Sequence, residues 1–159
     1  MRYQERLWVP PAYWLIGLFF GLTTIIGVTF SLGDTILWGS VALACAILAW
    51  ALLSWGSASV TVTDRGLLAD GAFLEYEFMG PVTVLDEAAT RIRLGRDADR
   101  RAFLVARPYL RRAVVVAVAD PADPHPFWLI TSRRPVELAE SLAGAARASG
   151  RSIDVTLPR

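Results

Sequence analysis

Few side chains in this sequence have the types and spacing that catalysis or metal binding requires. His125 is the only histidine and Cys45 the only cysteine. Zinc sites and nucleophile–histidine pairs need partner residues that this chain lacks. Because His125 lies between two prolines, we interpret it as a turn residue. The sequence therefore predicts no catalytic residues, no metal site and no cofactor, and we expect the protein not to be an enzyme.

Two pairs of acidic residues are further candidates for acid–base catalysis or cation binding. Glu75 and Glu77 lie two residues apart on one face of a predicted strand, where they could act in acid–base catalysis only if a pKa were raised. Asp120 and Asp123 could bind a hard cation, but calcium takes about six to eight oxygen ligands. A solvated strand face explains the first pair, and turns before proline explain the second.

Arginines form the clearest charge pattern. Residues 91–112 contain eight arginines against Asp97 and Asp99, a balance of +6, whereas residues 64–87 contain six acids against Arg65, a balance of −5. Two interpretations remain open: a solvated surface with internal ion pairs, or a basic face that contacts anionic lipid or an acidic partner. With the whole chain near neutral, no nucleic-acid partner is expected. The candidate contact residues are Arg91, Arg93, Arg96, Arg100, Arg101, Arg107, Arg111 and Arg112.

A long apolar region, residues 12–55, precedes the domain that carries these side chains. Asp34 is its only charged residue. As helices, residues 12–32 and 35–55 would each rise about 31 Å, close to the hydrocarbon thickness of about 30 Å. The sequence thus predicts an N-terminal transmembrane α-helical hairpin of two spans within a first domain at 1–56. It predicts a multi-pass plasma-membrane protein integrated in the lipid bilayer.

Two further features concern this hairpin. Arg2 and Arg6 precede the first span and Arg65 follows the second, so both termini are expected in the cytoplasm. Gly17 and Gly21 form a GxxxG motif, which lets helix backbones approach closely in a membrane. This candidate seam could pack the two helices together, or it could join a homodimer or a membrane-protein partner.

The second domain, residues 57–159, has the pattern of a small cytoplasmic β domain. Asp70-Gly71 predicts a hairpin turn, and Asp86 can cap a helix that continues to Arg93. Ser132 can cap a C-terminal helix at about 133–149 that Gly150 ends. This helix has an apolar stripe at helical spacing, formed by Leu138, Ala139, Leu142, Ala145 and Ala146. Apolar and polar residues alternate in about seven predicted strands. These strands cover residues 59–63, 67–69, 72–78, 82–85, 103–106, 113–119 and 126–131. The last two are expected to pair as a hairpin.

This order of elements predicts a mostly-β α+β domain with the topology of a pleckstrin-homology-like bent barrel. About seven strands form the barrel, and the C-terminal helix closes one end. A simpler α+β sheet with the helix on one face is the alternative. Neither fold determines a function.

Two segments carry a resemblance to a known family. Residues 3–10, YQERLWVP, and residues 120–135, DPADPHPFWLITSRRP, resemble an actinobacterial membrane family known as domain of unknown function 3093. The resemblance covers nearly the whole chain. It implies a small plasma-membrane protein with two spans and a pleckstrin-homology-like domain, and it implies no catalytic residue or cofactor.

Two classes of function are compatible with these observations. The first is a membrane-tethered binding or scaffold module at the cytoplasmic face of the plasma membrane. The alternative is an enzyme, or an accessory subunit of a membrane enzyme, that acts on a polar lipid headgroup. The missing nucleophile, metal and nucleotide motifs favour the binding module.

Overall fold

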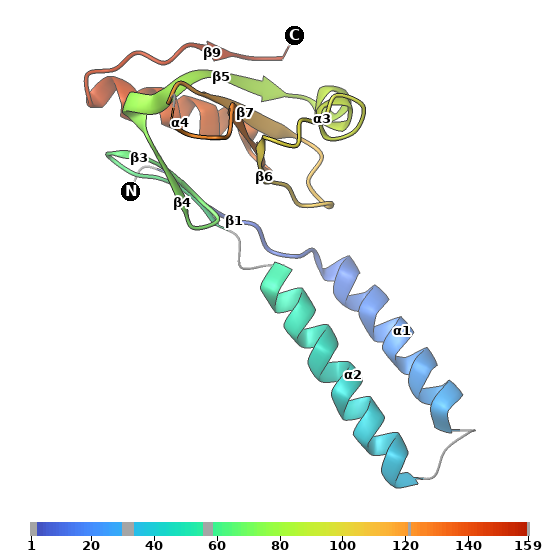
Figure 1. Ribbon diagram of the computed structural model, residues 1–159. Helices are drawn as coiled ribbons and strands as arrows, with labels where there is room; N and C mark the ends of the chain where they lie inside the picture. The colour runs from blue at the N-terminus through green and yellow to red at the C-terminus, as the bar shows by residue number, and fades with distance from the viewer. Residues whose placement is uncertain (1–2, 30–33, 56–58, 121, 159) are drawn as a thin grey trace. The chain divides into compact units, whose positions relative to one another are not determined.

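The computed structural model describes residues 3–29, 34–55, 59–120 and 122–158. These residues form nine strands, four α-helices and one short 3-10 helix (Figure 1). The chain divides into two compact units. The helical unit contains α1 and α2, and the β unit contains β1, Leu7 and every element from β2 onward.

The helical unit consists of α1 (Pro11–Thr29) and α2 (Asp34–Trp55). The two helices run antiparallel and contact each other (Figure 1). Proline suits the first position of α1, where its missing N–H has no helical acceptor. Large apolar side chains on both helices are exposed, among them Phe19 and Trp50.

No helix in the described part of the chain is both long enough and apolar enough to cross a membrane. This finding contradicts the predicted transmembrane hairpin, the multi-pass plasma-membrane localisation with cytoplasmic termini, and integration in the lipid bilayer. The prediction was based on the length of uncharged sequence alone, which does not establish that a helix crosses a membrane. Residues 30–33, where the first predicted span ends, and residues 56–58, at the predicted domain boundary, lie outside the described residues.

Sheet A has the strand order β1-β2-β3-β4, and all its pairs are antiparallel. The Asp70-Gly71 turn is confirmed, since both residues have positive φ (49° and 88°) between the paired strands β3 and β4. The strand predicted at 72–78 is shorter, because the 3-10 helix η1 (Tyr76–Phe78) follows it. The strands are β1 (Tyr3–Arg6), β2 (Ser59–Val62), β3 (Gly66–Ala69) and β4 (Ala72–Glu75).

Sheet B has the order β6-β8-β7-β5-β9. The predicted β7–β8 hairpin is confirmed, whereas β6 pairs with β8 and β9 with β5 in parallel. Two sheets of four and five strands therefore replace the predicted seven-strand barrel. The strands are β5 (Met79–Leu85), β6 (Phe103–Val105), β7 (Ala113–Val118), β8 (Phe127–Thr131) and β9 (Val155–Thr156).

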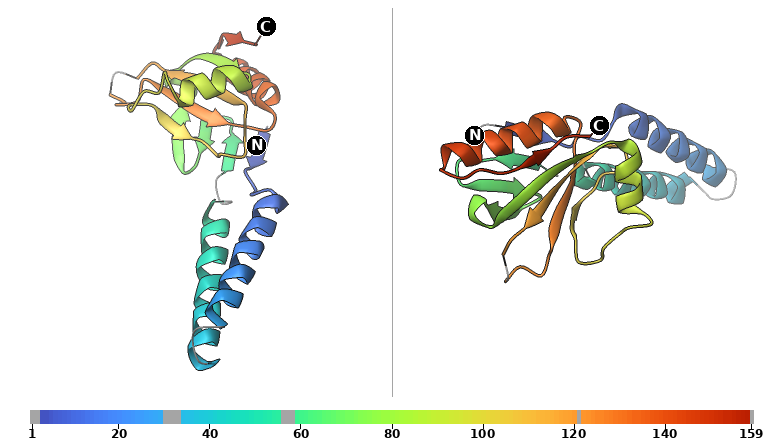
Figure 2. Two further views of the ribbon diagram at one scale, coloured as in Figure 1. Left: turned by 90° about the vertical axis from the view of Figure 1, so that its right-hand side faces the viewer. Right: turned by 90° about the horizontal axis from the view of Figure 1, so that it is seen from above.

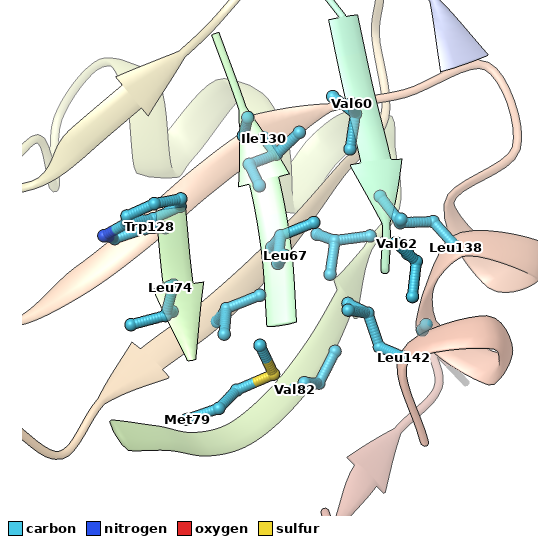
Figure 3. Packing of buried hydrophobic residues seen from close by; sticks show 14 of the residues in the cluster. Val60, Val62, Leu67, Leu74, Met79, Val82, Trp128, Ile130, Leu138 and Leu142 are labelled. Atoms are coloured by element: carbon cyan, nitrogen blue, oxygen red, sulfur yellow. The ribbon is translucent and has the colours of Figure 1, made fainter. Parts of the chain in front are cut away.

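The main core lies between the two sheets and α4 (Pro135–Ala148). α4 contacts β2 and β3 of sheet A and β5, β7 and β9 of sheet B, so it joins the two sheets. Its apolar stripe includes Leu138 and Leu142, both fully buried. Figure 3 shows these two leucines beside Val62 of sheet A and Val82 of sheet B. The predicted stripe of α4 is thus the surface that closes the core.

After the end of α4, the chain turns back and its last strand, β9, pairs with β5 of sheet B. Gly150 has a φ of 86°, and the Arg151 N–H donates to the Ala146 carbonyl at 2.9 Å, as in a Schellman motif. The chain then reverses, buries Ile153, and runs as β9 alongside β5 and α4 (Figure 2). The helix therefore ends where its glycine predicts.

Candidate functional site

The candidate site is the arginine segment, residues 91–112, which begins in α3 (Glu87–Leu94). The Asp86 carboxylate accepts a hydrogen bond from the Ala89 N–H at 2.7 Å, which confirms the predicted N-cap. Glu87 lies in the first turn and Arg91 and Arg93 in the last, the distribution that favours the helix dipole. The short helix thus places two arginines at its C-terminal end.

Ion pairs join the start of the arginine segment to its end. Arg111 Nη1 lies 3.0 Å from Glu87 Oε1, and Arg91 Nη2 lies 3.4 Å from the same oxygen. One carboxylate therefore brings together two arginines that are distant in sequence. Both side chains remain largely exposed, at 74% and 80%, so each pair is screened by water and contributes little stability.

Arg93 has a different partner. Its guanidinium carbon lies 4.4 Å from the centroid of the Phe127 ring, on β8, in a cation–π contact. In the part of the chain that the structure describes, Arg93 forms no ion pair. Phe127 was not predicted as a partner of Arg93, because 34 residues separate the two in the chain and no short-range pattern links them.

The segment after α3 is held by local contacts. Arg101 donates side-chain and backbone hydrogen bonds to Asp99, which together hold the pKa of that carboxyl below its usual range. His125 Nδ1 lies 2.7 Å from the Arg101 carbonyl oxygen, and the imidazole lies beside the Phe103 ring. His125 thus contacts the backbone of the arginine segment in addition to standing in a turn.

The remaining arginines do not form one group. Arg107 lies apart, because its guanidinium is 3.8 Å from Asp70 in the β3–β4 turn. Arg96 pairs with Asp97 at 3.2 Å. Arg100 and Arg112 are exposed, and neither forms an ion pair with any described residue. Five of the eight arginines therefore share four carboxylates, those of Glu87, Asp97, Asp99 and Asp70.

A pocket of about 330 Å³ lies beside α3 on the outer face of sheet B. The sheet contributes the floor, and α3 contributes one wall that includes Arg93. The lining is mostly apolar, with two charged residues. The pocket residues are Thr83, Leu85, Ala89, Ile92, Arg93, Asp97 and Val115.

The acidic candidates lie elsewhere. Glu75 ends β4 and Glu77 lies in η1, so they do not share the strand face that was predicted. Asp120 accepts a hydrogen bond from the Ala122 N–H and Asp123 from the His125 N–H, each at 2.8 Å, the geometry of turn-forming aspartates. Within the described residues no three His, Cys, Asp or Glu side chains gather as a metal site.

A second polar cluster joins the N-terminal strand to the start of α4. Glu5 accepts hydrogen bonds from the Tyr3 hydroxyl at 2.9 Å, the Ser132 hydroxyl at 2.5 Å and the Arg133 N–H at 2.9 Å. Burial raises the pKa of the Tyr3 hydroxyl well above its ordinary value. Ser132 also accepts from the Arg134 N–H at 3.0 Å, but Arg134 occupies the N-cap position predicted for Ser132.

This cluster joins two segments that are distant in the sequence. Residues 3–10 contain Tyr3 and Glu5, and residues 120–135 contain Ser132 and Arg133. The Arg133 guanidinium also donates to the Arg6 carbonyl at 3.1 Å. The contact between the two motifs was not predicted, because residues 3–6 were assigned to the helical domain at 1–56.

In the helical unit, Gly17 and Gly21 have different surroundings. A Cβ atom on Gly17 would lie 3.0 Å from both terminal carbons of Leu48, so the helices approach closely at this position. A Cβ atom on Gly21 would meet nothing within 4 Å. Gly21 instead lines an apolar cavity of about 360 Å³ between α1 and α2, together with Cys45.

The two sheets, the bridging helix α4 and the exposed arginine segment define an α+β protein with a basic surface and no metal cluster among its described residues. The sequence profile of DUF3093, a protein family of unknown function, matches residues 2–142. The chain belongs to this family, as the resemblance of residues 3–10 and 120–135 implied. Searches of curated proteins and of solved structures found no match.

Proposed function

We propose that this protein is a non-enzymatic binding module, and that its arginine segment, residues 91–112, holds an acidic segment of a partner protein. The observation that supports this proposal is the excess of arginines over carboxylates. Five of the eight arginines share four carboxylates, and Arg93, Arg100 and Arg112 form no ion pair among the described residues. An acidic partner would supply the missing carboxylates.

Exposure of these side chains also supports binding. The side chains of Arg96 and Arg101 are 81% and 73% exposed, so a partner reaches them without rearrangement of the core. Their carboxylate partners, Asp97 and Asp99, are near neighbours in the chain. Such a surface increases association rates and specificity more than it increases affinity.

The test measures fluorescence anisotropy of a labelled acidic peptide with the full-length chain. The peptide alternates Asp and Glu and has one central Ala. Replacement of Arg96, Arg100 and Arg101 by Ala should weaken binding about tenfold, since each exposed pair contributes about 0.5 kcal/mol. Binding should also weaken between about 0.1 M and about 1 M salt, because the Debye length falls from about 10 Å to about 3 Å.

The control replaces three arginines outside the segment, Arg65, Arg134 and Arg147, by Ala and so changes the net charge equally. This control should bind nearly as well as the parent. Equal loss in both triple variants would show that net charge alone attracts the peptide, and the proposal would fail. Absence of salt-sensitive binding to the parent would also overturn it.

All 16 basic residues are arginine. This composition supports our further proposal that the protein has an actinobacterial source, because arginine in place of lysine accompanies GC-rich coding sequences. A coding sequence without GC enrichment would contradict it.

A further inference from the structure

The outer face of sheet B is unusually apolar for a surface that one short helix covers. Ala113, Phe127 and Leu129 are buried there and form a second small core, against which Leu85 and Val115 pack. An antiparallel sheet with one solvated face would instead alternate apolar and polar residues. α3 and the segment after it cover this face, but the cover is incomplete above Leu85 and Val115.

The uncovered part is the pocket of about 330 Å³ beside α3. Thr83, Leu85 and Val115 form its floor, and Ile92 of α3, which is 43% exposed, forms part of its rim. The residues of the floor belong to adjacent strands, because Thr83 pairs directly with Val115. A rigid sheet therefore presents an apolar concavity, which suits one apolar side chain of a ligand.

Arg93 supplies a polar group at this pocket. Its cation–π contact with Phe127 fixes the guanidinium at 4.4 Å from the ring centroid, and no described carboxylate pairs with it. A planar guanidinium that lies over a ring keeps its N–H donors at its edge, where they match a carboxylate in bidentate geometry. Asp97, the other charged lining residue, already pairs with Arg96.

We infer that this pocket binds a large apolar side chain of an acidic partner segment, while Arg93 binds a neighbouring carboxylate of the same segment. The inference rests on the proposed function. It adds an apolar pocket that makes the binding specific for acidic segments with a large apolar side chain. The occupant follows from charge complementarity, since the pocket has two charged lining residues: Arg93 forms no ion pair with a described residue, whereas Asp97 already pairs with Arg96. Acidic segments without an apolar side chain bind weakly, and apolar segments without carboxylates leave Arg93 unpaired.

The experiment compares two labelled peptides of alternating Asp and Glu, one with a central Phe and one with a central Ala, on the full-length chain. The Phe peptide should bind about tenfold more tightly, the fold-change that burial of one aromatic side chain produces. Thr83→Trp fills the pocket and should remove this difference. Arg93→Gln should weaken binding of the Phe peptide about tenfold.

Matched controls place the same changes outside the pocket. Leu157→Trp adds a tryptophan at an exposed position, and Arg147→Gln removes one charge from the end of α4. Both should leave the preference for Phe intact. If both peptides bind equally and in a salt-sensitive manner, the pocket inference fails while the proposed function stands. If neither peptide binds, the proposed function itself fails. A preference for Phe that survives Thr83→Trp and Arg93→Gln would also overturn the pocket inference.

Discussion

The Glu5 carboxylate accepts three hydrogen bonds that connect β1 to the segment before α4. Ser132, one of the donors, is only 2% exposed, so the loss of an acceptor would leave a buried hydroxyl without its partner. Such losses cost more than a hydrogen bond contributes, because the desolvated donor is not returned to water. At the residue scale, Glu5 thus stabilises the β unit by satisfying donors from two segments that are distant in sequence.

We expect Glu5→Gln to lower the free energy of unfolding by about 1–3 kcal/mol, because an amide replaces one accepting oxygen by a donor. Urea unfolding of the full-length chain measures this change. Glu140→Gln is the control, since Glu140 is an exposed residue of α4. Equal unfolding midpoints for the two variants would contradict the structural role of Glu5.

The buried hydroxyl of Tyr3 should make the free energy of unfolding depend on pH in the alkaline range. Burial raises the pKa of its hydroxyl in the folded state above the ordinary value of about 10. Above about pH 10 the unfolded chain has lost a proton that the folded chain retains, so stability is complete below this pH and declines above it. Between about pH 9 and about pH 11, the free energy of unfolding should therefore fall less for Tyr3→Phe than for the parent. Tyr13→Phe is a control in α1, and an equal decline in all three proteins would refute the prediction.

At the scale of elements, the close approach of α1 and α2 depends on one glycine of the GxxxG motif. A Cβ atom on Gly17 would lie 3.0 Å from Leu48, closer than ordinary van der Waals contact, whereas Gly21 lines the cavity. Gly17→Leu should thus force the helices apart and lower the stability of their packing by about 1–3 kcal/mol.

Gly21→Leu should have a much smaller effect, because its side chain enters a cavity of about 360 Å³. Thermal unfolding followed by circular dichroism at the helical band compares the two variants. A loss of stability in Gly21→Leu as large as that in Gly17→Leu would show that the seam involves both glycines equally.

At the scale of the whole molecule, the β unit is assembled from two segments of the chain. β1 pairs with β2 along its full length, and Arg6 lies directly opposite Ser59. Leu7 is fully buried, and its carbonyl accepts a hydrogen bond from the Tyr109 hydroxyl. The helical unit is therefore an insertion between two adjacent strands of one sheet.

Because Arg6 and Ser59 are neighbours, replacement of residues 9–57 by a short Gly-Ser linker should leave a β unit that folds. A fragment that starts at residue 58 lacks β1 and Leu7, and we expect it to unfold at lower urea concentration or to aggregate through the exposed edge of β2. Circular dichroism and urea unfolding compare the two proteins. Equal stability of the fragment and the linked protein would show that β1 is dispensable.

Short-range features of the fold were predictable from the sequence. The Asp70-Gly71 turn, the Asp86 cap, the β7–β8 hairpin and the apolar stripe of α4 were all recognised correctly. Each depends on backbone sterics, capping or side-chain periodicity within a few neighbouring residues. Family membership was also recognisable, since residues 3–10 and 120–135 resemble the family whose profile matches residues 2–142. The arginine segment was recognisable because its excess of arginine depends only on local composition.

Tertiary structure alone decided which distant segments meet. The pairing of β1 with β2, the Glu5–Ser132 hydrogen bond and the contact of Arg93 with Phe127 each join residues that no local pattern relates. The division into two sheets and the parallel pairs of β6 and β9 likewise depend on the packing of the whole core. The sequence by itself determined the local turns, caps and charges. Their partners were decided by the tertiary structure, because long-range contacts form only when many residues bury their apolar surface together.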